Sequence, residues 1–239
     1  MQTAILAGGM GTRIRAVAGG LPKSLIPVAG RPFIEWQLDL LRRSGLRDVL
    51  LCVGVGADAI RAHVGDGTRF GMRVAYAVED PSALCGTGGA LVNARPQLRR
   101  SFLVMYGDSY LPTDYAAVCS AFDACPHPGL MCVYRNEGRW DTSNVRVADG
   151  RVVFYDKKAP PGTVDCIDYG LSALRRDVIE RYRDAALPLD LARILSDLVA
   201  NGELAAREVT ERFYEIGKPE GLRELGALLR DAPKAGRTP

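Results

Sequence analysis

Apolar residues along the chain follow two alternating patterns. Short uninterrupted apolar runs, such as 3–7 and 101–106, are typical of strands buried on both faces of a parallel sheet. Between the runs lie segments such as 31–44, where apolar residues recur at helical spacing and Gly45 follows as a stop signal. This alternation predicts an α/β fold. Strands are expected at 3–7, 48–55, 73–78, 101–106, 130–135, 166–174 and 204–209, and helices at 31–44, 57–64, from 86 onward, 114–124, 175–182, 189–200 and after Pro219.

The segment 144–155 departs from this rhythm. Its apolar residues alternate with polar ones on both sides of Asp149-Gly150, which is a strong signal for an antiparallel β-hairpin. The later run 204–209 is short, and we interpret it as an edge strand. The central sheet is therefore expected to be mixed but mainly parallel.

Composition favours one domain. A chain of 239 residues with 47% hydrophobic content can bury a sizeable core, and we take residues 1–230 as a single domain. Residues 231–239, which are rich in Ala, Gly and Pro, are interpreted as a disordered tail. Because 31 basic and 28 acidic residues leave a net charge of +3, the sequence does not predict the clustered basic face that binds nucleic acid.

The cysteines, the histidines and the length of the apolar runs exclude several further classes of protein. The six cysteines form no CxxC pair, and several lie inside apolar runs, so we expect reduced thiols. His63 and His127 are the only histidines, so the sequence offers few residues that could form a zinc site or a Ser-His-Asp triad. The chain enters its first strand without a basic leader, and no apolar stretch approaches the roughly 18 residues of a membrane span. We therefore expect a cytoplasmic protein that does not bind membranes.

A glycine-rich segment follows the first apolar run. Gly8, Gly9 and Gly11 remove side chains where the chain leaves the strand, and this exposes backbone amides. Arg13 and Lys23 add a guanidinium and an ammonium group near the same strand end. These groups suit several negative charges, and a triphosphate is the first candidate. The alternative is an ordinary loop with solvated surface charges.

Two common phosphate motifs do not fit this segment. In the dinucleotide pattern G-x-G-x-x-G, the third glycine would fall on Ile14. The Walker A motif requires glycine directly before Lys-Ser, whereas Lys23 follows Pro22. What remains is G-x-G-T-R at 9–13, followed by P-K-x-L-x-P-V at 22–28.

This pattern resembles the nucleotide-binding signature of the sugar-phosphate nucleotidyltransferases, also called NDP-sugar pyrophosphorylases. The resemblance implies a Rossmann-like, three-layer α/β/α fold with the antiparallel hairpin on the sugar side. It also implies catalytic roles for Arg13 and Lys23, with Arg13 stabilising the pyrophosphate leaving group. The nucleotide-binding residues that it implies are Leu6, Ala7, Gly8, Gly9, Gly11, Thr12, Glu79, Gly86, Thr87, Gly88 and Asp108.

Two further motifs concern the base and the metal. G-T-G-G-A-L at 86–91 follows the third strand, as the base-binding loop of the family does, which assigns Gly88 and Glu79 to base contacts. Read alone, the same glycines mark a helix start with Thr87 as its cap. Asp108 follows the fourth strand, where the family's G-D motif binds Mg²⁺. Glu215 stands where the family has a second metal-binding Asp, and whether it binds directly or through water is left open.

The sugar side rests on two motifs. Asp156-Lys157-Lys158 resembles E-K-P/K, whose lysine contacts the phosphate of the sugar, although a solvated lysine pair at a strand end explains the residues equally well. The stretch 166–174 is similar to the strand that carries N-A-G-I-Y in the family, and it assigns sugar contacts to Asp168 and Gly170. Asp168 replaces the usual Asn.

The resemblance implies transfer of a nucleotidyl group from an NTP to a sugar 1-phosphate, with Mg²⁺ as cofactor. Within the family, the motif details are most similar to the D-glycero-α-D-manno-heptose 1-phosphate guanylyltransferases of bacterial capsule and surface glycan synthesis, which favours GTP. Mannose 1-phosphate guanylyltransferases and uridylyltransferases for glucose or N-acetylmuramate 1-phosphate stay open. So do a cytidylyltransferase for a non-sugar alcohol phosphate and a non-catalytic nucleotide-sugar sensor. The oligomeric state is also open, with a homodimer among the options.

Overall fold

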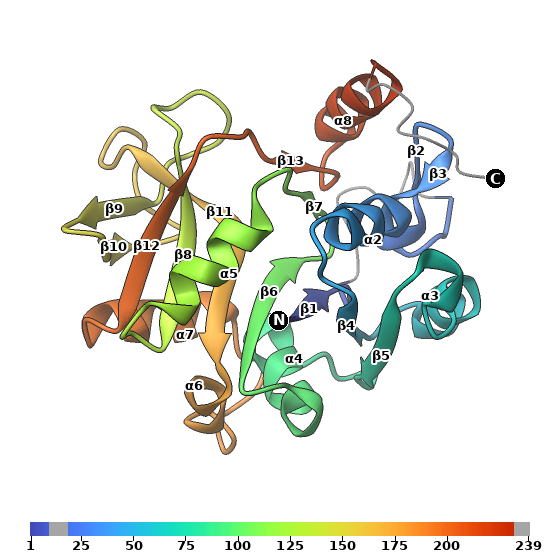
Figure 1. Cartoon of the computed structure of the whole chain (residues 1–239), viewed down its shortest axis with the longest axis horizontal. Coiled ribbons are helices and arrows are strands. Elements are labelled where there is room, and N and C mark those ends of the chain that lie inside the picture. Colours follow the sequence, from blue (N-terminus) through green and yellow to red (C-terminus); the bar gives the residue numbers. More distant parts are fainter. Residues whose placement is uncertain (10–18, 232–239) are drawn as a thin grey trace.

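A nine-stranded sheet forms the centre of the molecule in the computed structural model, which describes residues 1–9 and 19–231. Figure 1 shows β1 and β6 near the middle of this sheet. The strand order is β5-β4-β1-β6-β11-β8-β12-β10-β9. The strands are β1 (Gln2–Leu6), β4 (Asp48–Val53), β5 (Arg73–Val78), β6 (Ser101–Tyr106), β8 (Gly129–Arg135), β9 (Val145–Ala148), β10 (Arg151–Tyr155), β11 (Cys166–Arg175) and β12 (Leu204–Val209).

The sheet has two halves with different pairing. In the parallel half, which comprises β5, β4, β1 and β6, all neighbours run in the same direction. In the mixed half, which comprises β11, β8, β12, β10 and β9, β11 is antiparallel to both β6 and β8, whereas β12 is parallel to β8. The last two strands form the expected hairpin, in which Asp149 and Gly150 both have positive φ, as a tight type I′ turn requires.

Helices cover both faces of the sheet. One face carries α2 (Phe33–Arg43), α3 (Ala57–Val64) and α5 (Tyr115–Asp123), and the other carries α4 (Gly86–Ala94), α6 (Arg176–Glu180) and α7 (Leu191–Ala200). The fold is therefore a three-layer α/β/α sandwich with a mixed sheet, which confirms the predicted fold class. Short 3₁₀ helices occur at η2 (Lys23–Leu25), η3 (Thr68–Phe70) and η4 (Arg95–Gln97).

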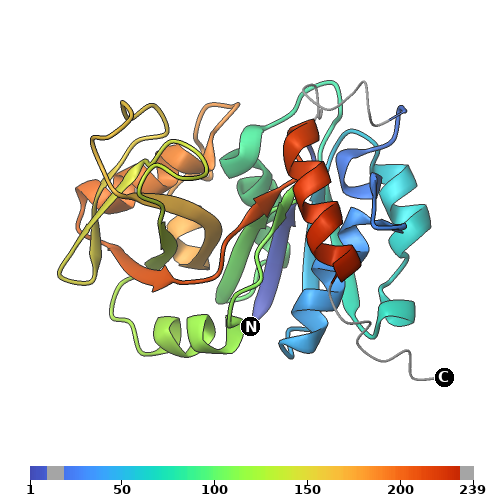
Figure 2. The ribbon, with the colours of Figure 1, turned by 90° about the horizontal axis from the view of Figure 1, so that it is seen from above.

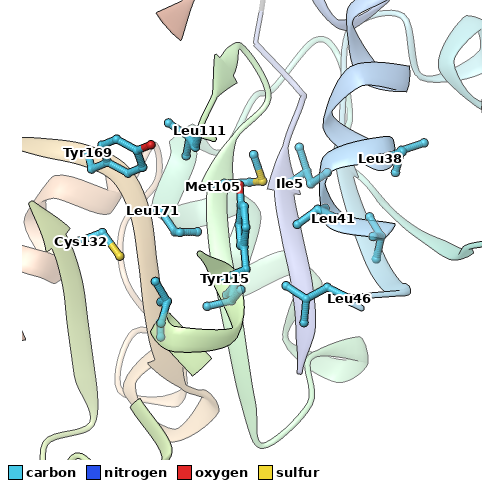
Figure 3. Close-up of a cluster of buried hydrophobic side chains, with 14 of the residues drawn as sticks. Ile5, Leu38, Leu41, Leu46, Met105, Leu111, Tyr115, Cys132, Tyr169 and Leu171 are labelled. Atoms are coloured by element: carbon cyan, nitrogen blue, oxygen red, sulfur yellow. The ribbon is translucent and has the colours of Figure 1, made fainter. Parts of the chain in front are cut away.

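The apolar core lies where the central strands meet these helices. On the first face, Ile5 of β1 and Met105 of β6 pack with Leu38 and Leu41 of α2 and with Tyr115 of α5 (Figure 3). All five side chains are almost fully buried. Full burial of each aliphatic side chain contributes about 1.5–3 kcal/mol relative to exposure, so this cluster fixes the helices on the sheet.

A smaller layer lies outside the main sheet. α8 (Pro219–Asp231) packs with β2 (Pro27–Val28), and β13 (Tyr214–Glu215) pairs with β7 (Ser109–Tyr110). β2 also pairs with β3 (Arg31–Pro32). Figure 2 shows α8, drawn in red, outside the main sheet. The chain thereby returns at its C-terminal end to the loop that follows β6.

One topological expectation was wrong. β12 is not an edge strand, because it lies between β8 and β10. Its register with β8 runs over its whole length, whereas its register with β10 has a single pair, Arg151 with Ala205. A short strand with charged residues has the same local pattern at an edge and at such a weakly paired position. Of the tail expected at 231–239, Asp231 is the last residue of α8, and residues 232–239 lie outside the described residues.

Within the part of the chain that the structure describes, none of the helices combines the length and the apolar character needed to cross a lipid bilayer.

Candidate active site

The site forms at the carboxyl ends of the parallel strands, where β1 lies between β4 and β6. The chain winds outward in both directions from this point, which is where open α/β sheets bind ligands. The amide of Gly107 donates a hydrogen bond to the carbonyl of Leu6 across 2.9 Å, and a Cβ on Gly107 would lie only 2.7 Å from that oxygen. Glycine is therefore required for this close approach of two loops.

A cleft of about 290 Å³ opens above these strand ends. Most of the predicted nucleotide-binding residues that the structure describes line it, together with Lys23. The predicted residues in the wall are Leu6, Ala7, Gly8, Gly9, Glu79, Gly86, Thr87 and Asp108. The residues that sequence analysis did not single out are Ser24, Leu84, Ala90, Tyr106, Gly107 and Gly217. Gly11, Thr12 and Arg13 lie outside the described residues, so their predicted roles stay predictions.

Lys23 and Asp108 form an ion pair inside this cleft. Lys23 begins η2, and Asp108 follows β6, so the folding of the sheet brings together two residues that are 85 positions apart. Gly217 lies beside the pair, where a Cβ would be 3.2 Å from Lys23 Nζ. A side chain at Gly217 would therefore crowd the ammonium group.

Glu215 joins this end of the cleft through β13. The amide of Ile216 donates to the carbonyl of Asp108 across 2.9 Å, and Glu215 pairs with Ser109. Glu215 reaches solvent and is not among the lining residues. The surrounding protein nevertheless desolvates its carboxyl, and this effect, with the negative charge of Asp108, raises the pKa of Glu215 to about 7.

The donors near Asp108 suit a divalent cation that also takes oxygen ligands from a substrate. Two neighbouring carboxylates disfavour each other's ionised form, and a bound cation would relieve that repulsion. Magnesium is usually held by one or two carboxylates together with phosphate oxygens. Among the described residues, no three His, Cys, Asp or Glu side chains gather into a complete metal site. Asp108 and Glu215 therefore fit a shared protein and substrate site.

Glu79 is a buried carboxylate in the wall of the cleft. Its residue is only 6% exposed, and Oε2 accepts a hydrogen bond from the amide of Cys85 across 2.8 Å. The other oxygen, Oε1, lies toward Gly8, where an added Cβ would be 3.5 Å away. A buried acceptor thus faces the loop that follows β1.

The glycine-rich loop at the start of α4 packs against the segment before α7. Gly86 has a φ of +79°, and a Cβ there would lie 2.5 Å from the carbonyl oxygen of Leu189. The amide of Gly88 donates to the same oxygen across 2.9 Å. Gly88 is buried against Leu189 and Asp190 and does not line the cleft, so its predicted base contact stays a prediction.

The expected cap at Thr87 was wrong. The N-cap of α4 is Cys85, and Thr87 lies inside the helix. The Thr87 hydroxyl instead accepts from the amide of Leu191, at the start of α7, and donates to Asp190. It therefore stabilises the neighbouring helix, a contact across 104 residues that a local pattern does not reveal.

The predicted sugar-side residues lie in the mixed half. Asp168 accepts hydrogen bonds from the amide of Gly170 across 2.9 Å and from the hydroxyl of Tyr155 across 3.1 Å. Burial raises the pKa of Asp168, although these two bonds and the charge of Lys157 oppose the shift. Lys157 pairs with Asp190, and its Nζ lies 5.8 Å from the centre of the Tyr106 ring.

Tyr106 borders both the cleft and the predicted sugar-side residues. It lines the cleft, and it also lines a smaller cavity with Asp168 and Gly170. Its hydroxyl is buried and has no hydrogen-bond partner among the described residues. Burial, with the charges of Asp168 and Asp190, raises the pKa of Tyr106 well above its ordinary value. As the last residue of an apolar strand, Tyr106 carried no separate signal in the sequence.

The cleft lies at the carboxyl ends of the parallel strands of a three-layer α/β/α fold, and comparison with known proteins gives the family. The model of the nucleotidyl transferase family matches residues 2–141. A D-glycero-α-D-manno-heptose 1-phosphate guanylyltransferase from Campylobacter jejuni is 30% identical over 224 residues, which cover 92% of this chain and 96% of that protein. The chain belongs to the nucleotidyltransferase family.

Other similarities differ in extent. A glucose-1-phosphate thymidylyltransferase from Streptomyces griseus is 38% identical over 112 residues, which cover 46% of this chain but only 31% of that protein. A structure of a Bacillus anthracis protein in complex with a sucrose has a TM-score of 0.88 at 19% identity, with coverage of 99% of this chain and 98% of that one. At this identity the structural likeness supports the fold alone.

Proposed function

We propose that the protein transfers the guanylyl group of GTP to D-glycero-α-D-manno-heptose 1-phosphate, which yields a GDP-heptose and pyrophosphate for bacterial capsule or surface glycans. The observation that carries the proposal is the end-to-end similarity to the Campylobacter heptose 1-phosphate guanylyltransferase. The cleft beside Lys23 and Asp108 supports it, because it joins cationic, acidic and backbone groups at one strand end.

The reaction needs no covalent intermediate. An oxygen of the sugar phosphate forms a bond to the α-phosphorus of GTP, while the bond from that phosphorus to the bridging oxygen breaks and pyrophosphate leaves. In this proposal, Lys23 binds the phosphates and Arg13 stabilises the charge that develops on the leaving group. Such catalysis rests on positioning and electrostatics.

Members of this family use divalent metal ions, and Mg²⁺ is the proposed one here. Asp108 and Glu215 would hold it. When bound, the ion neutralises charge on the phosphate oxygens. Lys23, which pairs with Asp108 in this structure, would then share the phosphates with the ion.

Glu79 supports the choice of guanine. Guanine carries adjacent N–H donors on one edge, at its ring nitrogen and its exocyclic amine, and a carboxylate can accept both because its oxygens have several lone pairs. Uracil and thymine offer one such donor beside carbonyl acceptors, and these acceptors would face an acceptor. Glu79 lines the cleft and is buried, so a mismatched base would leave a buried polar group without a partner.

The sugar phosphate is assigned to the mixed half. Lys157 would bind its phosphate, and Asp168 and Gly170 would contact the hydroxyl groups of the sugar. Tyr106 lines the cleft, and a Cβ on Gly170 would lie 3.5 Å from the ring of Tyr106, so the proposed subsites adjoin.

A pyrophosphate-release assay tests the proposal. Purified protein with Mg²⁺ is supplied with GTP, UTP, CTP, ATP or dTTP, each crossed with heptose, mannose, glucose or N-acetylmuramate 1-phosphate. We expect release with GTP and heptose 1-phosphate to exceed every other pair. The Streptomyces relative makes dTTP with glucose 1-phosphate the second candidate, and preference for that pair would replace the proposed substrates. Tight nucleotide binding without release from any pair would favour a sensor.

A further inference from the structure

Asp190 joins three parts of the molecule at one carboxylate. It is the N-cap of α7, where Oδ1 accepts from the amide of Ala192 across 2.9 Å. The same oxygen accepts from the hydroxyl of Thr87 across 3.0 Å. Lys157 Nζ lies 2.9 Å from Oδ1 and 3.1 Å from Oδ2. A residue that no sequence motif singled out thus links the α4 loop to the sugar-side lysine.

The arrangement requires a carboxylate. Oδ1 serves three donors, and Oδ2 serves Lys157. Burial opposes ionisation of Asp190, but the hydrogen bonds from Ala192, Lys157 and Thr87 outweigh it and lower the pKa. A neutral amide would keep the oxygen that caps the helix, but it would turn an NH₂ group toward the ammonium of Lys157.

Global stability does not explain this pair. The side chains of Lys157 and Asp190 are 41% and 55% exposed, and ion pairs at such positions contribute little to folding. What the pair does fix is the place of the ammonium group. Lys157 has a long flexible stem, and Asp190 holds its Nζ 5.8 Å from the centre of the Tyr106 ring. Tyr106 itself lines the cleft.

We propose that Asp190 is a positioning residue, which holds Lys157 at the junction of the two subsites so that an incoming sugar phosphate meets an already oriented cation. The proposal rests on the proposed function in one respect, the assignment of Lys157 to the phosphate. Orienting a lysine in advance avoids part of the rotamer entropy that binding would otherwise remove. Loss of Asp190 should therefore weaken sugar phosphate binding about tenfold.

The variant Asp190→Asn isolates this role from helix capping, because Asn and Asp are equally good N-caps. We expect KM for the sugar 1-phosphate to rise about tenfold, with KM for the nucleotide and the melting temperature nearly unchanged. Asp190→Glu restores the charge but caps less well. If Asp190 positions Lys157, Glu recovers KM better than Asn does, whereas a purely structural role predicts the reverse order in both KM and stability.

Two further variants complete the test. In the background Lys157→Met, Asp190→Asn should cause no additional rise in KM, because it acts through the lysine. Glu208→Gln is the matched control, since it breaks a surface ion pair with Arg135 whose side chains are 50% and 47% exposed. It should leave both KM values unchanged. An unchanged KM for the sugar 1-phosphate in Asp190→Asn, or a lower one, would overturn the proposal.

A second readout separates this inference from the proposed function. Side-chain NMR of ¹⁵N-labelled lysines follows the Lys157 ammonium directly, with its signal assigned by its loss in Lys157→Met. D-glycero-α-D-manno-heptose 1-phosphate should shift this signal at about tenfold lower concentration in the unmodified protein than in Asp190→Asn. That result without turnover of any substrate pair would sink the proposed function and support the positioning role. An equal response in both proteins would overturn the positioning role.

Discussion

The parallel half and the mixed half build their parts of the site from different materials. At the ends of β1 and β6, backbone amides and glycines line the cleft, and Gly107 packs directly on the backbone of Leu6. In the mixed half, the proposed site is a network of charged side chains around Asp168 and Asp190. The family model matches residues 2–141, which include the whole parallel half but only β8 of the mixed half. A site made of backbone requires a fixed pattern of glycines, whereas a side-chain network leaves more room for change.

The largest effect is expected from removing the ammonium group of Lys23, which lies in the cleft at the parallel half. Lys23→Met should lower kcat roughly 10²- to 10³-fold. Other enzymes lose this much when one group that stabilises charge in the transition state is removed. The fold should persist, because Lys23 is at the rim of the core and its side chain keeps some exposure. Steady-state kinetics with the best substrate pair measures the change. The exposed Lys158→Met is the control, and near-normal turnover of Lys23→Met would contradict the assigned role.

A smaller effect is expected on base choice. Glu79→Gln keeps an oxygen for the amide of Cys85 but replaces the other acceptor with an NH₂ group, which opposes the donors of guanine. The ratio of kcat/KM for GTP to that for UTP should fall about 10- to 10²-fold, since a hydrogen bond to a charged group contributes about 1.5–3 kcal/mol. Asp80→Asn, at the exposed neighbouring position, should leave this ratio unchanged. A ratio unaffected by Glu79→Gln would show that base selection lies elsewhere.

Backbone contact in the parallel half can be tested by a methyl group. Gly107→Ala would place Cβ 2.7 Å from Leu6 O and 2.9 Å from Ala7 Cα, and neither backbone atom can move freely. We expect the free energy of unfolding to fall by about 1–3 kcal/mol, measured by denaturant titration, and nucleotide affinity to fall with it. Gly9→Ala is the control for stability, because nothing lies within 4 Å of its added Cβ. Equal stabilities of the two variants would refute the packing argument.

The smallest effect concerns Asp168 in the mixed half. Because its pKa is raised in the folded protein, the folded state holds this proton more tightly than the unfolded state does. The contribution of Asp168 to stability therefore falls as pH rises from the ordinary carboxyl pKa through the raised one. Unfolding free energies of the unmodified protein and Asp168→Asn, measured across this range, should diverge in favour of Asn as pH rises. A constant or opposite difference would count against a desolvated Asp168.

Local patterns predicted the elements more reliably than their contacts. The bounds of α3, β5 and β6 agree with the sequence, because apolar periodicity is a property of neighbouring residues. The position of β12 was missed, since pairing on both sides depends on strands far away in the sequence. The same holds for Thr87, whose hydroxyl serves α7 rather than its own helix.

The residues of the candidate site also differ in how well the sequence predicts them. Its glycines and Lys23 are recognisable because they form a compact motif in the sequence. Asp190 was invisible, because its partners Thr87 and Lys157 are 103 and 33 residues away and no motif surrounds it. Tyr106 lies at the end of an apolar strand, where the sequence pattern indicates a core residue and not a site residue. Residues whose roles arise only from long-range packing carry no local signal.

Hydrogen–deuterium exchange with each ligand alone tests the division between the two halves most directly. GTP with Mg²⁺ should slow exchange at the amides of 7–9 and 86–89, and a sugar 1-phosphate should slow exchange around 156–158 and 166–171. Protection that separates in this way would support a nucleotide site in the parallel half and a sugar site in the mixed half. Protection of the mixed half by GTP alone, or of the parallel half by the sugar phosphate alone, would contradict the account.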